Sequence, residues 1–158
     1  MRIKIFYLSV LSLFFLFSGC GNVKQIEIFN QKNSNLNYKK DEIPITIVFY
    51  ELSNITKFKE AFIQDLIERE DTILGKDKID SIKLQMIPDD KIIITAIKKK
   101  DVPYIGILAI YADVKNKKIK SAIKSKEIRG KKITFEISKK GIFIEGNKNK
   151  KKELINGK

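Results

Sequence analysis

The 158-residue chain contains no histidine, no tryptophan and a single cysteine, Cys20. A lone thiol has no partner within the chain, so an intrachain disulfide is excluded. Zinc sites built from several cysteines or histidines are excluded too, as are catalytic dyads and triads that depend on histidine. At 43% hydrophobic residues, the chain still has enough apolar side chains for one folded domain. These absences leave few enzyme classes open.

The amino terminus has the pattern of an export signal. A basic start, with Arg2 and Lys4, precedes an apolar run over residues 5–17, and small residues lead to Cys20. This order is typical of a secretory signal, and the apolar run is short for a membrane span. We therefore expect residues 1–19 to be a signal peptide.

The residues around Cys20 resemble a bacterial lipobox, in which the cysteine thiol is alkylated by diacylglycerol and becomes the mature amino terminus. The two preceding residues are small, as expected, whereas Phe17 stands where leucine is usual. The alternative is an ordinary cleaved signal, or an uncleaved anchor, in which Cys20 is incidental. Gly21 rather than aspartate follows the cysteine, which in many Gram-negative bacteria permits export to the outer membrane. We expect Cys20 to be lipidated, with residues 20–22 as a tether.

The charge balance is strongly basic, with 32 Lys and Arg against 19 Asp and Glu, a net charge of +13. Removing residues 1–19 leaves 30 basic residues against 19 acidic ones, a net charge of +11. Such a surface attracts anionic partners: phospholipid headgroups, lipopolysaccharide phosphates or an acidic protein. However, 29 lysines against 3 arginines, together with 29 isoleucines, are also the bias expected from AT-rich codons. No basic motif interleaved with aromatic residues is present, so nucleic acid is a poor candidate partner.

Seven β-strands are predicted downstream of the tether. Residues 23–29 alternate as a half-buried strand does, while residues 45–52, which follow Pro44, are apolar on nearly both faces and predict a central strand. We expect the strand at 91–97 to pair with the strongly apolar segment 103–113 across a lysine-rich turn. The remaining strands are expected at residues 81–86, 131–137 and 142–145, the last two as a terminal hairpin.

A change of period between residues 54 and 69 predicts one amphipathic helix, with Thr56 as its N-cap. Its apolar stripe consists of Phe58, Ala61, Phe62 and Leu66. Short strands with one helical insert after the second strand predict a mainly β fold, a two-sheet β-sandwich over residues 23–146. Residues 147–158 are polar and basic, and we expect a disordered tail.

No motif of a familiar enzyme chemistry is present: there is no glycine-rich phosphate loop, no G-x-S-x-G turn and no H-E-x-x-H helix. Grouped carboxylates could serve glycoside hydrolysis or hold calcium, but each group lies at a helix end or turn beside lysine, where solvated charge is the simpler interpretation. The groups are Glu68/Glu70/Asp71, Asp77/Asp80 and Asp89/Asp90. The asparagine-rich loop at residues 30–42 has too few acids for a calcium loop. We therefore expect a binding module without catalytic residues, metal or cofactor, apart from the lipid on Cys20.

The order of these features resembles the TssJ family of type VI secretion lipoproteins. A lipobox, a strand and an asparagine-rich loop are followed by Pro44 and a strand that ends in Tyr50-Glu51-Leu52. The most specific match is a strand with the pattern Tyr-Ile-Gly-x-x-Ala-x-Tyr-x-Asp. Its residues are Tyr104, Ile105, Gly106, Ala109, Tyr111 and Asp113. The Phe-rich helical segment, the Leu74-Gly75 turn and Pro88 also match, whereas Asp89 replaces the usual glycine and the family's tryptophan has no counterpart, Ile119 standing nearest.

The resemblance implies a transthyretin-like β-sandwich that is lipid-anchored on the periplasmic face of the outer membrane. It implies binding to the periplasmic C-terminal region of the inner-membrane protein TssM, with TssL linked indirectly through the complex. The loop between the first two strands, residues 30–42, is the part implicated in this contact. The loop residues assigned to it are Asn33, Asn35, Leu36, Asn37 and Tyr38. Leu36 and Tyr38 are the anchor candidates, because interface energy concentrates in a few large side chains; alternatively, they merely cover the end of the sandwich.

Two other classes of function fit the sequence. A lipoprotein unrelated to secretion could bind a small ligand or glycan in a cleft of the sandwich, which an aromatic-rich concave patch would favour. A periplasmic inhibitor or adhesion module is the second alternative, and binding to a partner outside secretion would favour it.

Overall fold

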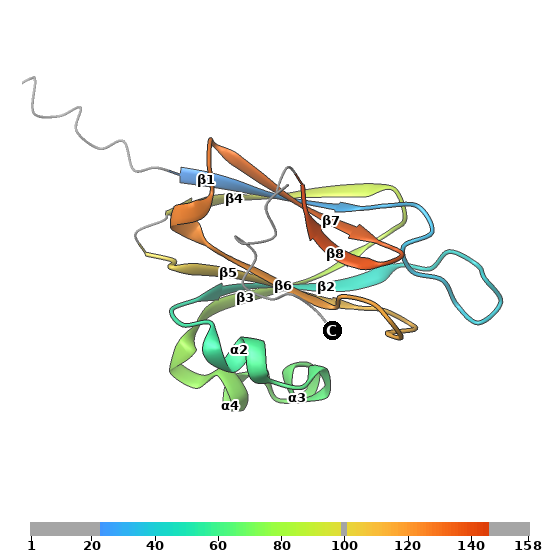
Figure 1. The fold of residues 1–158 in the computed structure, drawn as a ribbon, viewed down its shortest axis with the longest axis horizontal. Helices are drawn as coiled ribbons and strands as arrows, with labels where there is room; N and C mark the ends of the chain where they lie inside the picture. The colour runs from blue at the N-terminus through green and yellow to red at the C-terminus, as the bar shows by residue number, and fades with distance from the viewer. Residues whose placement is uncertain (1–22, 99–100, 146–158) are drawn as a thin grey trace, which may run out of the picture.

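The structure is a computed structural model, and it describes residues 23–98 and 101–145. The expected signal peptide, the tether with Cys20 and the basic tail lie outside these residues. Within them, eight strands form two four-stranded sheets that pack face to face (Figure 1). The strands are β1 (Val23–Asn30), β2 (Ile45–Leu52), β3 (Lys78–Met86), β4 (Asp90–Lys98), β5 (Tyr104–Ile110), β6 (Lys120–Lys124), β7 (Lys132–Ser138) and β8 (Gly141–Ile144). The first sheet has the order β4-β1-β7-β8 and the second β3-β2-β5-β6, which confirms the mainly β, two-sheet prediction.

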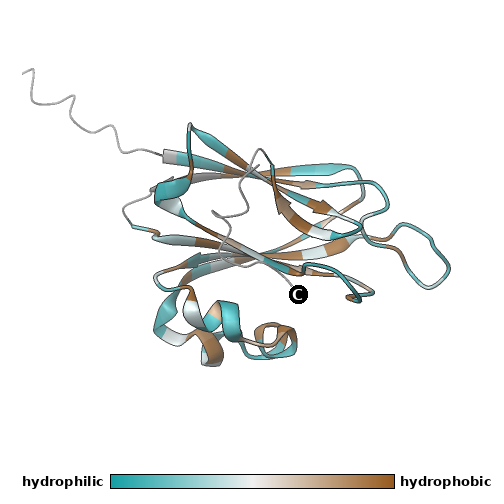
Figure 2. Ribbon diagram, in the orientation of Figure 1, coloured by the Kyte–Doolittle hydropathy of each residue, from teal (hydrophilic) through white to brown (hydrophobic). Residues whose placement is uncertain are grey.

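The core lies between the two sheets and consists largely of isoleucine. Ile26 and Ile28 of β1 meet Ile47 and Phe49 of β2 in one cluster, and all four are fully buried. Figure 2 shows the apolar residues concentrated along the strands and the polar residues in the connecting loops. β-Branched side chains suit such pleated surfaces. Every described core residue lies downstream of the expected signal peptide, so the mature chain contains the whole described core.

β2 is the central strand that its sequence predicted. It pairs antiparallel with β3 on one side and with β5 on the other. Its second face carries Val48, Tyr50 and Leu52, which are buried beneath short helices on the outer side of the second sheet (Figure 1). A strand that is covered on both faces needs apolar residues throughout, and this explains its continuous apolar run.

The predicted pairing of residues 91–97 with 103–113 is wrong. β4 pairs with β1 at the edge of the first sheet, whereas β5 lies in the second sheet between β2 and β6. The connection between β4 and β5 therefore crosses from one sheet to the other. Because β5 is buried along almost its whole length, it requires an interior position covered by the core on one face and by helices on the other.

One strand, β6, is missing from the prediction. Its sequence, Lys-Ser-Ala-Ile-Lys, is short, bounded by lysines and poor in apolar residues. It forms because it pairs antiparallel with β5 and completes the second sheet, which buries Ser121, Ala122 and Ile123. This segment is a strand because it pairs with β5, and not because of its own sequence pattern.

The single helix predicted over residues 54–69 is also wrong. Three short helices lie there, α2 (Thr56–Glu60), α3 (Ile63–Glu68) and α4 (Glu70–Leu74), followed by the 3-10 helix η2 (Gly75–Asp77). Between α2 and α3 the backbone of Ala61 and Phe62 is extended, with ψ angles of 141° and 149°. The breaks let each helix bury one side chain against the second sheet: Phe58, Leu66 and Leu74. They also leave Phe62, which was predicted on the buried stripe, 78% exposed.

The ends of α2 are held differently from the prediction. Thr56 is the first residue of α2 rather than its N-cap, which is Ile55, and the N–H of Thr56 donates a hydrogen bond to Asn54 Oδ1 (2.9 Å). At the other end, Lys120 Nζ on β6 donates to the carbonyl oxygens of Phe58 (3.0 Å) and Lys59 (2.9 Å). A lysine that caps a helix C-terminus satisfies unpaired carbonyls and interacts favourably with the helix dipole. None of the helices in the described ranges is long and apolar enough to cross a membrane.

Candidate partner-binding site

Three connections meet at one end of the sandwich and enclose a hollow of about 730 Å³. They are the β1–β2 loop (residues 31–44), which extends beyond the sheets in Figure 1, the β5–β6 loop (111–119) and the β7–β8 turn (139–140). We call this feature the loop-end hollow. Of the five residues that the sequence assigned to a partner contact, four line it: Asn33, Leu36, Asn37 and Tyr38.

Asn37 orders the tip of the β1–β2 loop. Its Oδ1 accepts hydrogen bonds from the N–H groups of Lys39 (2.8 Å) and Asp41 (2.9 Å), and its Nδ2 donates to the Asp41 carboxylate (3.0 Å). A β-bridge between Leu36 and Glu42 closes the base of the tip. Asparagine side chains that satisfy turn amides in this way stabilise the turn. Asn37 therefore shapes the loop rather than offering a free amide to a partner.

Asn35 is a buried support beneath the loop, with 3% of its surface exposed. Its Nδ2 donates to the carbonyl of Pro44 (2.9 Å), and its Oδ1 accepts from the N–H of Ala112 (2.8 Å). The side chain thus joins the β1–β2 loop to the β5–β6 loop. It does not line the loop-end hollow, and its role there is to position the residues that do.

Tyr38 and Leu36 are the side chains best placed for contact. Tyr38 is 87% exposed, and Lys39 Nζ lies 5.6 Å from its ring centroid. Leu36 is half-buried and lines the hollow. Asn33 is exposed with a φ of 57°, a conformation that asparagine tolerates, and its N–H donates to the Glu42 side chain.

The rim of the loop-end hollow is basic, a feature that was not predicted from the sequence. Lysines from all three connections line it: Lys40, Lys115, Lys117, Lys139 and Lys140. Asp113 is the acidic residue among the lining residues. Lys117 Nζ lies 4.5 Å from the centroid of the buried Tyr111 ring, and burial lowers the pKa of Lys117. Lysine-rich turns were visible in the sequence, but only the fold brings them beside the β1–β2 loop.

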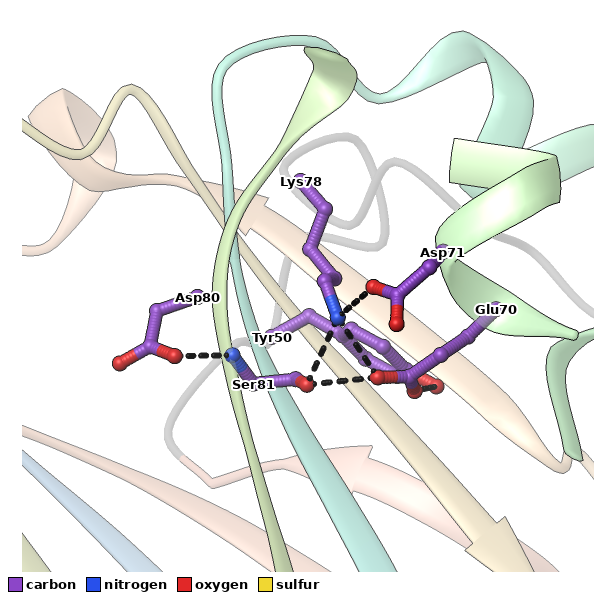
Figure 3. A network of polar contacts seen from close by, with 6 residues as sticks. All are labelled: Tyr50, Glu70, Asp71, Lys78, Asp80 and Ser81. Atoms are coloured by element: carbon purple, nitrogen blue, oxygen red, sulfur yellow. Dashed lines mark hydrogen bonds and ion pairs between the residues drawn. The ribbon is translucent and has the colours of Figure 1, made fainter. Parts of the chain in front are cut away.

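None of the grouped carboxylates that the sequence offered for hydrolysis or calcium binding lines the loop-end hollow. Glu70 accepts hydrogen bonds from Tyr50 Oη (2.9 Å), Lys78 Nζ (2.8 Å) and Ser81 Oγ (2.7 Å), as Figure 3 shows. Lys78 also forms an ion pair with Asp71. The interpretation as solvated charge is therefore wrong for Glu70, which is half-buried and ties α4 to the second sheet. In the ranges that the structure describes, no cluster of three or more histidine, cysteine, aspartate or glutamate side chains could hold a metal ion.

We expect the ionised Glu70 side chain to stabilise the domain near neutral pH, so that the free energy of unfolding falls when Glu70 is protonated in acid. Burial alone would raise the pKa of Glu70, but hydrogen bonds from Lys78, Ser81 and Tyr50 outweigh it and lower the pKa below its usual value of 4.5. A carboxyl with a lowered folded-state pKa stabilises the fold above its unfolded pKa, and this stabilisation is lost as the pH falls through the folded pKa.

Chemical unfolding of the wild type and of Glu70→Gln, from about pH 7 to pH 3, measures this effect. The difference in free energy of unfolding between the two proteins should shrink as the pH falls below about 4.5. Glu68→Gln, at an exposed position of α3, is the matched control and should change stability little. A difference for Glu70→Gln that stays constant across this range would contradict the prediction.

Comparison with known proteins places this geometry in a family. Residues 24–140 match the family described as "Type VI secretion lipoprotein, VasD, EvfM, TssJ, VC_A0113". The T6SS lipoprotein TssJ1 from Pseudomonas aeruginosa is 18% identical with a TM-score of 0.69, over 77% of this chain and 93% of that one. Lip from Serratia marcescens, a membrane-bound component of the Type VI Secretion System, is 17% identical with a TM-score of 0.66, over 77% and 94%.

A third similar chain comes from a structure described as the T6SS protein TssM C-terminal domain from EAEC. It is 17% identical with a TM-score of 0.67, over 77% of this chain and 98% of that one. No curated protein matches the chain significantly. At these identities the structural matches establish the fold. The family match spans both sheets and all three connections around the loop-end hollow, and that family consists of structural lipoproteins rather than enzymes. The chain belongs to the TssJ family of type VI secretion lipoproteins.

Proposed function

We propose that this protein is a lipid-anchored component of the outer membrane that binds the periplasmic C-terminal region of TssM and thereby anchors the type VI secretion membrane complex. Membership of the secretion lipoprotein family supports the role. The similarity to a chain from a structure described as the TssM C-terminal domain supports the choice of partner. TssL is then linked to this protein indirectly, through the complex.

The observation that carries the proposal is Tyr38, which is 87% exposed on a loop that its own hydrogen bonds hold in shape. Large aromatic side chains contribute disproportionately to interface energy. Asn35 and Asn37 hold the loop in place, so little conformational entropy remains to be lost on binding. Leu36, at the wall of the hollow, adds apolar surface beside the tyrosine.

The five lysines around the loop-end hollow indicate the chemistry of the partner surface. A segment of TssM that carries carboxylates would complement them. Electrostatic complementarity of this kind raises the association rate and weakens with added salt. We therefore propose that the partner segment is acidic and that its binding is salt-sensitive.

A lipid on Cys20 would supply the membrane anchor. Three residues lead from Cys20 to the start of β1, so at about 3.5 Å per extended residue the sandwich would begin within about 10 Å of the Cys20 Cα. One acyl chain binds a membrane marginally, whereas several bind it durably. β1 is eight residues long and runs from the tether towards the loop-end hollow. At about 3.3 Å per residue, β1 alone spans about 26 Å between the tether and the loop-end hollow.

The test is a titration of the mature chain against the periplasmic domain of TssM from the same organism. We expect a variant with Leu36→Ala and Tyr38→Ala to bind at least about 30-fold more weakly, because a hot-spot residue contributes about 2 kcal/mol or more. Phe62→Ala is the matched control, since it removes an aromatic side chain of similar exposure (78%) from the helical insert. It should leave Kd unchanged. Circular dichroism confirms that each variant is folded.

Binding that is unaffected by the double variant would move the contact away from the loop-end hollow. No binding by the folded wild type would overturn the proposal and favour a lipoprotein that binds a small ligand or glycan. The mass of the mature protein extracted from membranes separately tests whether Cys20 is acylated.

A further inference from the structure

We propose that the tether end of the sandwich is a phospholipid-binding surface, formed by the turn that joins β6 to β7. Its ligand is the anionic headgroup of the leaflet that holds the acyl chains. That this surface faces the membrane rests on the proposed function, in which a lipid on Cys20 anchors the protein. The surface itself lies at the opposite end of the sandwich from the loop-end hollow and would act independently of it.

The turn lies directly against the start of β1. The N–H of Gln25 donates to the carbonyl of Lys131 (2.9 Å), and Lys24 Nζ donates to the carbonyl of Gly130. Gly130 and Lys131 are thus in hydrogen-bond contact with the chain one or two residues after Val23. With the tether of about 10 Å, the turn cannot be far from the membrane surface. We call residues 124–132 the basic turn.

The basic turn is held in a defined shape. The N–H of Ser125 donates to the carbonyl of Pro103 (2.9 Å), and the N–H of Ile128 donates to the carbonyl of Ser125 (3.3 Å). The Ile128 side chain is 3% exposed and belongs to the main core. Gly130, at a φ of 71°, completes the reversal of the chain. A turn that is pinned through its centre presents its remaining side chains outward.

The outward side chains are basic. The basic turn contains five lysine or arginine residues and one acidic residue, Glu127. Lys126, Arg129 and Lys131 are exposed, and within the described residues none of them has an ion-pair partner. Glu127 is half-buried, and its Oε2 is inaccessible to solvent. The exposed charge of the turn is therefore positive.

This charge is not simply the lysine bias of the whole chain. Residues 51–80, which carry the helical insert, contain eight acidic and five basic residues, although the chain as a whole has a net charge of +13. The surfaces of the sandwich therefore differ in sign. The loop-end hollow is basic as well, but the tether holds the opposite end at the bilayer, so the basic turn is the surface within reach of the headgroups. This favours an orientation in which the loop-end hollow points away from the bilayer, towards a partner that crosses the periplasm.

Distance and screening are compatible with binding. Electrostatic attraction to an anionic bilayer acts within about one Debye length, about 8 Å at physiological ionic strength. Within that range each basic residue strengthens membrane binding by about fivefold, so three residues together provide about a hundredfold. Such an attraction is too weak to anchor the protein alone, but it is sufficient to orient a protein that its lipid already holds at the surface.

The test uses the mature chain with Cys20→Ser, which removes the lipid and retains the whole described core. Its partitioning is measured by co-sedimentation with vesicles of phosphatidylcholine, with and without about 30 mol% phosphatidylglycerol, at low and physiological salt. The variant carries Lys126→Gln, Arg129→Gln and Lys131→Gln. The matched control removes the same charge from exposed lysines elsewhere, as Lys59→Gln, Lys76→Gln and Lys83→Gln. Thermal unfolding confirms that both are folded.

We expect the wild type to prefer the anionic vesicles, the basic-turn variant to lose between about tenfold and a hundredfold of that binding, and the control to lose only a few-fold. Equal binding of the wild type to both vesicles, or equal losses in variant and control, would overturn the proposal. Titration with the TssM domain keeps the two proposals separate, because the basic-turn variant should retain partner binding. Loss of vesicle binding therefore leaves the partner proposal standing, and failure of TssM binding leaves the vesicle result intact.

Discussion

Replacing Gly141 by alanine is expected to lower the free energy of unfolding by about 4 kcal/mol or more. Gly141 has a φ of 116°, a conformation that residues with a side chain rarely adopt. A Cβ at this position would lie 2.4 Å from both the backbone N and the backbone O of Lys118. Because these are backbone atoms, no side-chain rotation relieves the clash. The loss is a large fraction of the 5–15 kcal/mol that stabilises a typical domain.

The same contact supports the candidate binding site. The N–H of Lys118 donates to the carbonyl of Lys140 (3.1 Å), and the N–H of Ile142 donates to the carbonyl of Lys118 (2.8 Å). These bonds join the β5–β6 loop to the β7–β8 turn, and thereby one sheet to the other. Displacing either the β5–β6 loop or the β7–β8 turn would move the lysines that line the loop-end hollow. We therefore expect any folded Gly141→Ala protein to bind the TssM domain more weakly as well.

Denaturant unfolding of Gly141→Ala beside Gly130→Ala checks this prediction. Gly130 also has a positive φ, 71°, but an added Cβ there would meet nothing within 4 Å. The control variant should therefore lose only the backbone strain, about 1 kcal/mol. Similar losses in the two variants would show that the contact with Lys118 is unimportant.

Phe58→Ala is expected to destabilise the fold by about 3–5 kcal/mol, the usual range for a fully buried phenylalanine. The Phe58 side chain is 0% exposed, and its ring centroid lies 5.1 Å from that of Tyr50. Gly106 on β5 leaves room for it, since a Cβ at Gly106 would lie 3.0 Å from the ring. Truncation would empty the centre of the contact between the helical insert and the second sheet.

Unfolding measurements on Phe58→Ala and Phe62→Ala separate burial from residue type. Both residues belong to the same insert, but Phe62 is 78% exposed, and its replacement should cost less than about 0.5 kcal/mol. Limited proteolysis should cut the insert of Phe58→Ala sooner than that of the wild type, because the helices lose their main contact with the sheet. Equal stability of the two variants would contradict the packing described above.

Much of the fold was predictable because it depends on local pattern. The alternation in β1 and the continuous apolar run of β2 place strands where the structure has them. The site was predictable only in part. The β1–β2 loop was identified from its resemblance to the family, yet Asn35 turns out to be a buried support and Tyr38 an exposed tip, a distinction that one loop sequence does not contain. The lysines of the other two connections were not associated with the site at all.

The periodicity of most strands, the absence of histidine- and disulfide-based chemistry and the resemblance to a secretion lipoprotein all follow from the order of the amino acids. Only the folded chain shows that β4 and β5 lie in different sheets, that the insert breaks at Ala61 and Phe62, and that β6 is a strand. The difference lies in the range of the interactions. Propensity and alternation act within a few residues. Sheet partnership depends instead on segments that are distant in the sequence and meet only after folding. The hydrogen bond between Asn35 and Ala112, for example, joins residues that are 77 positions apart.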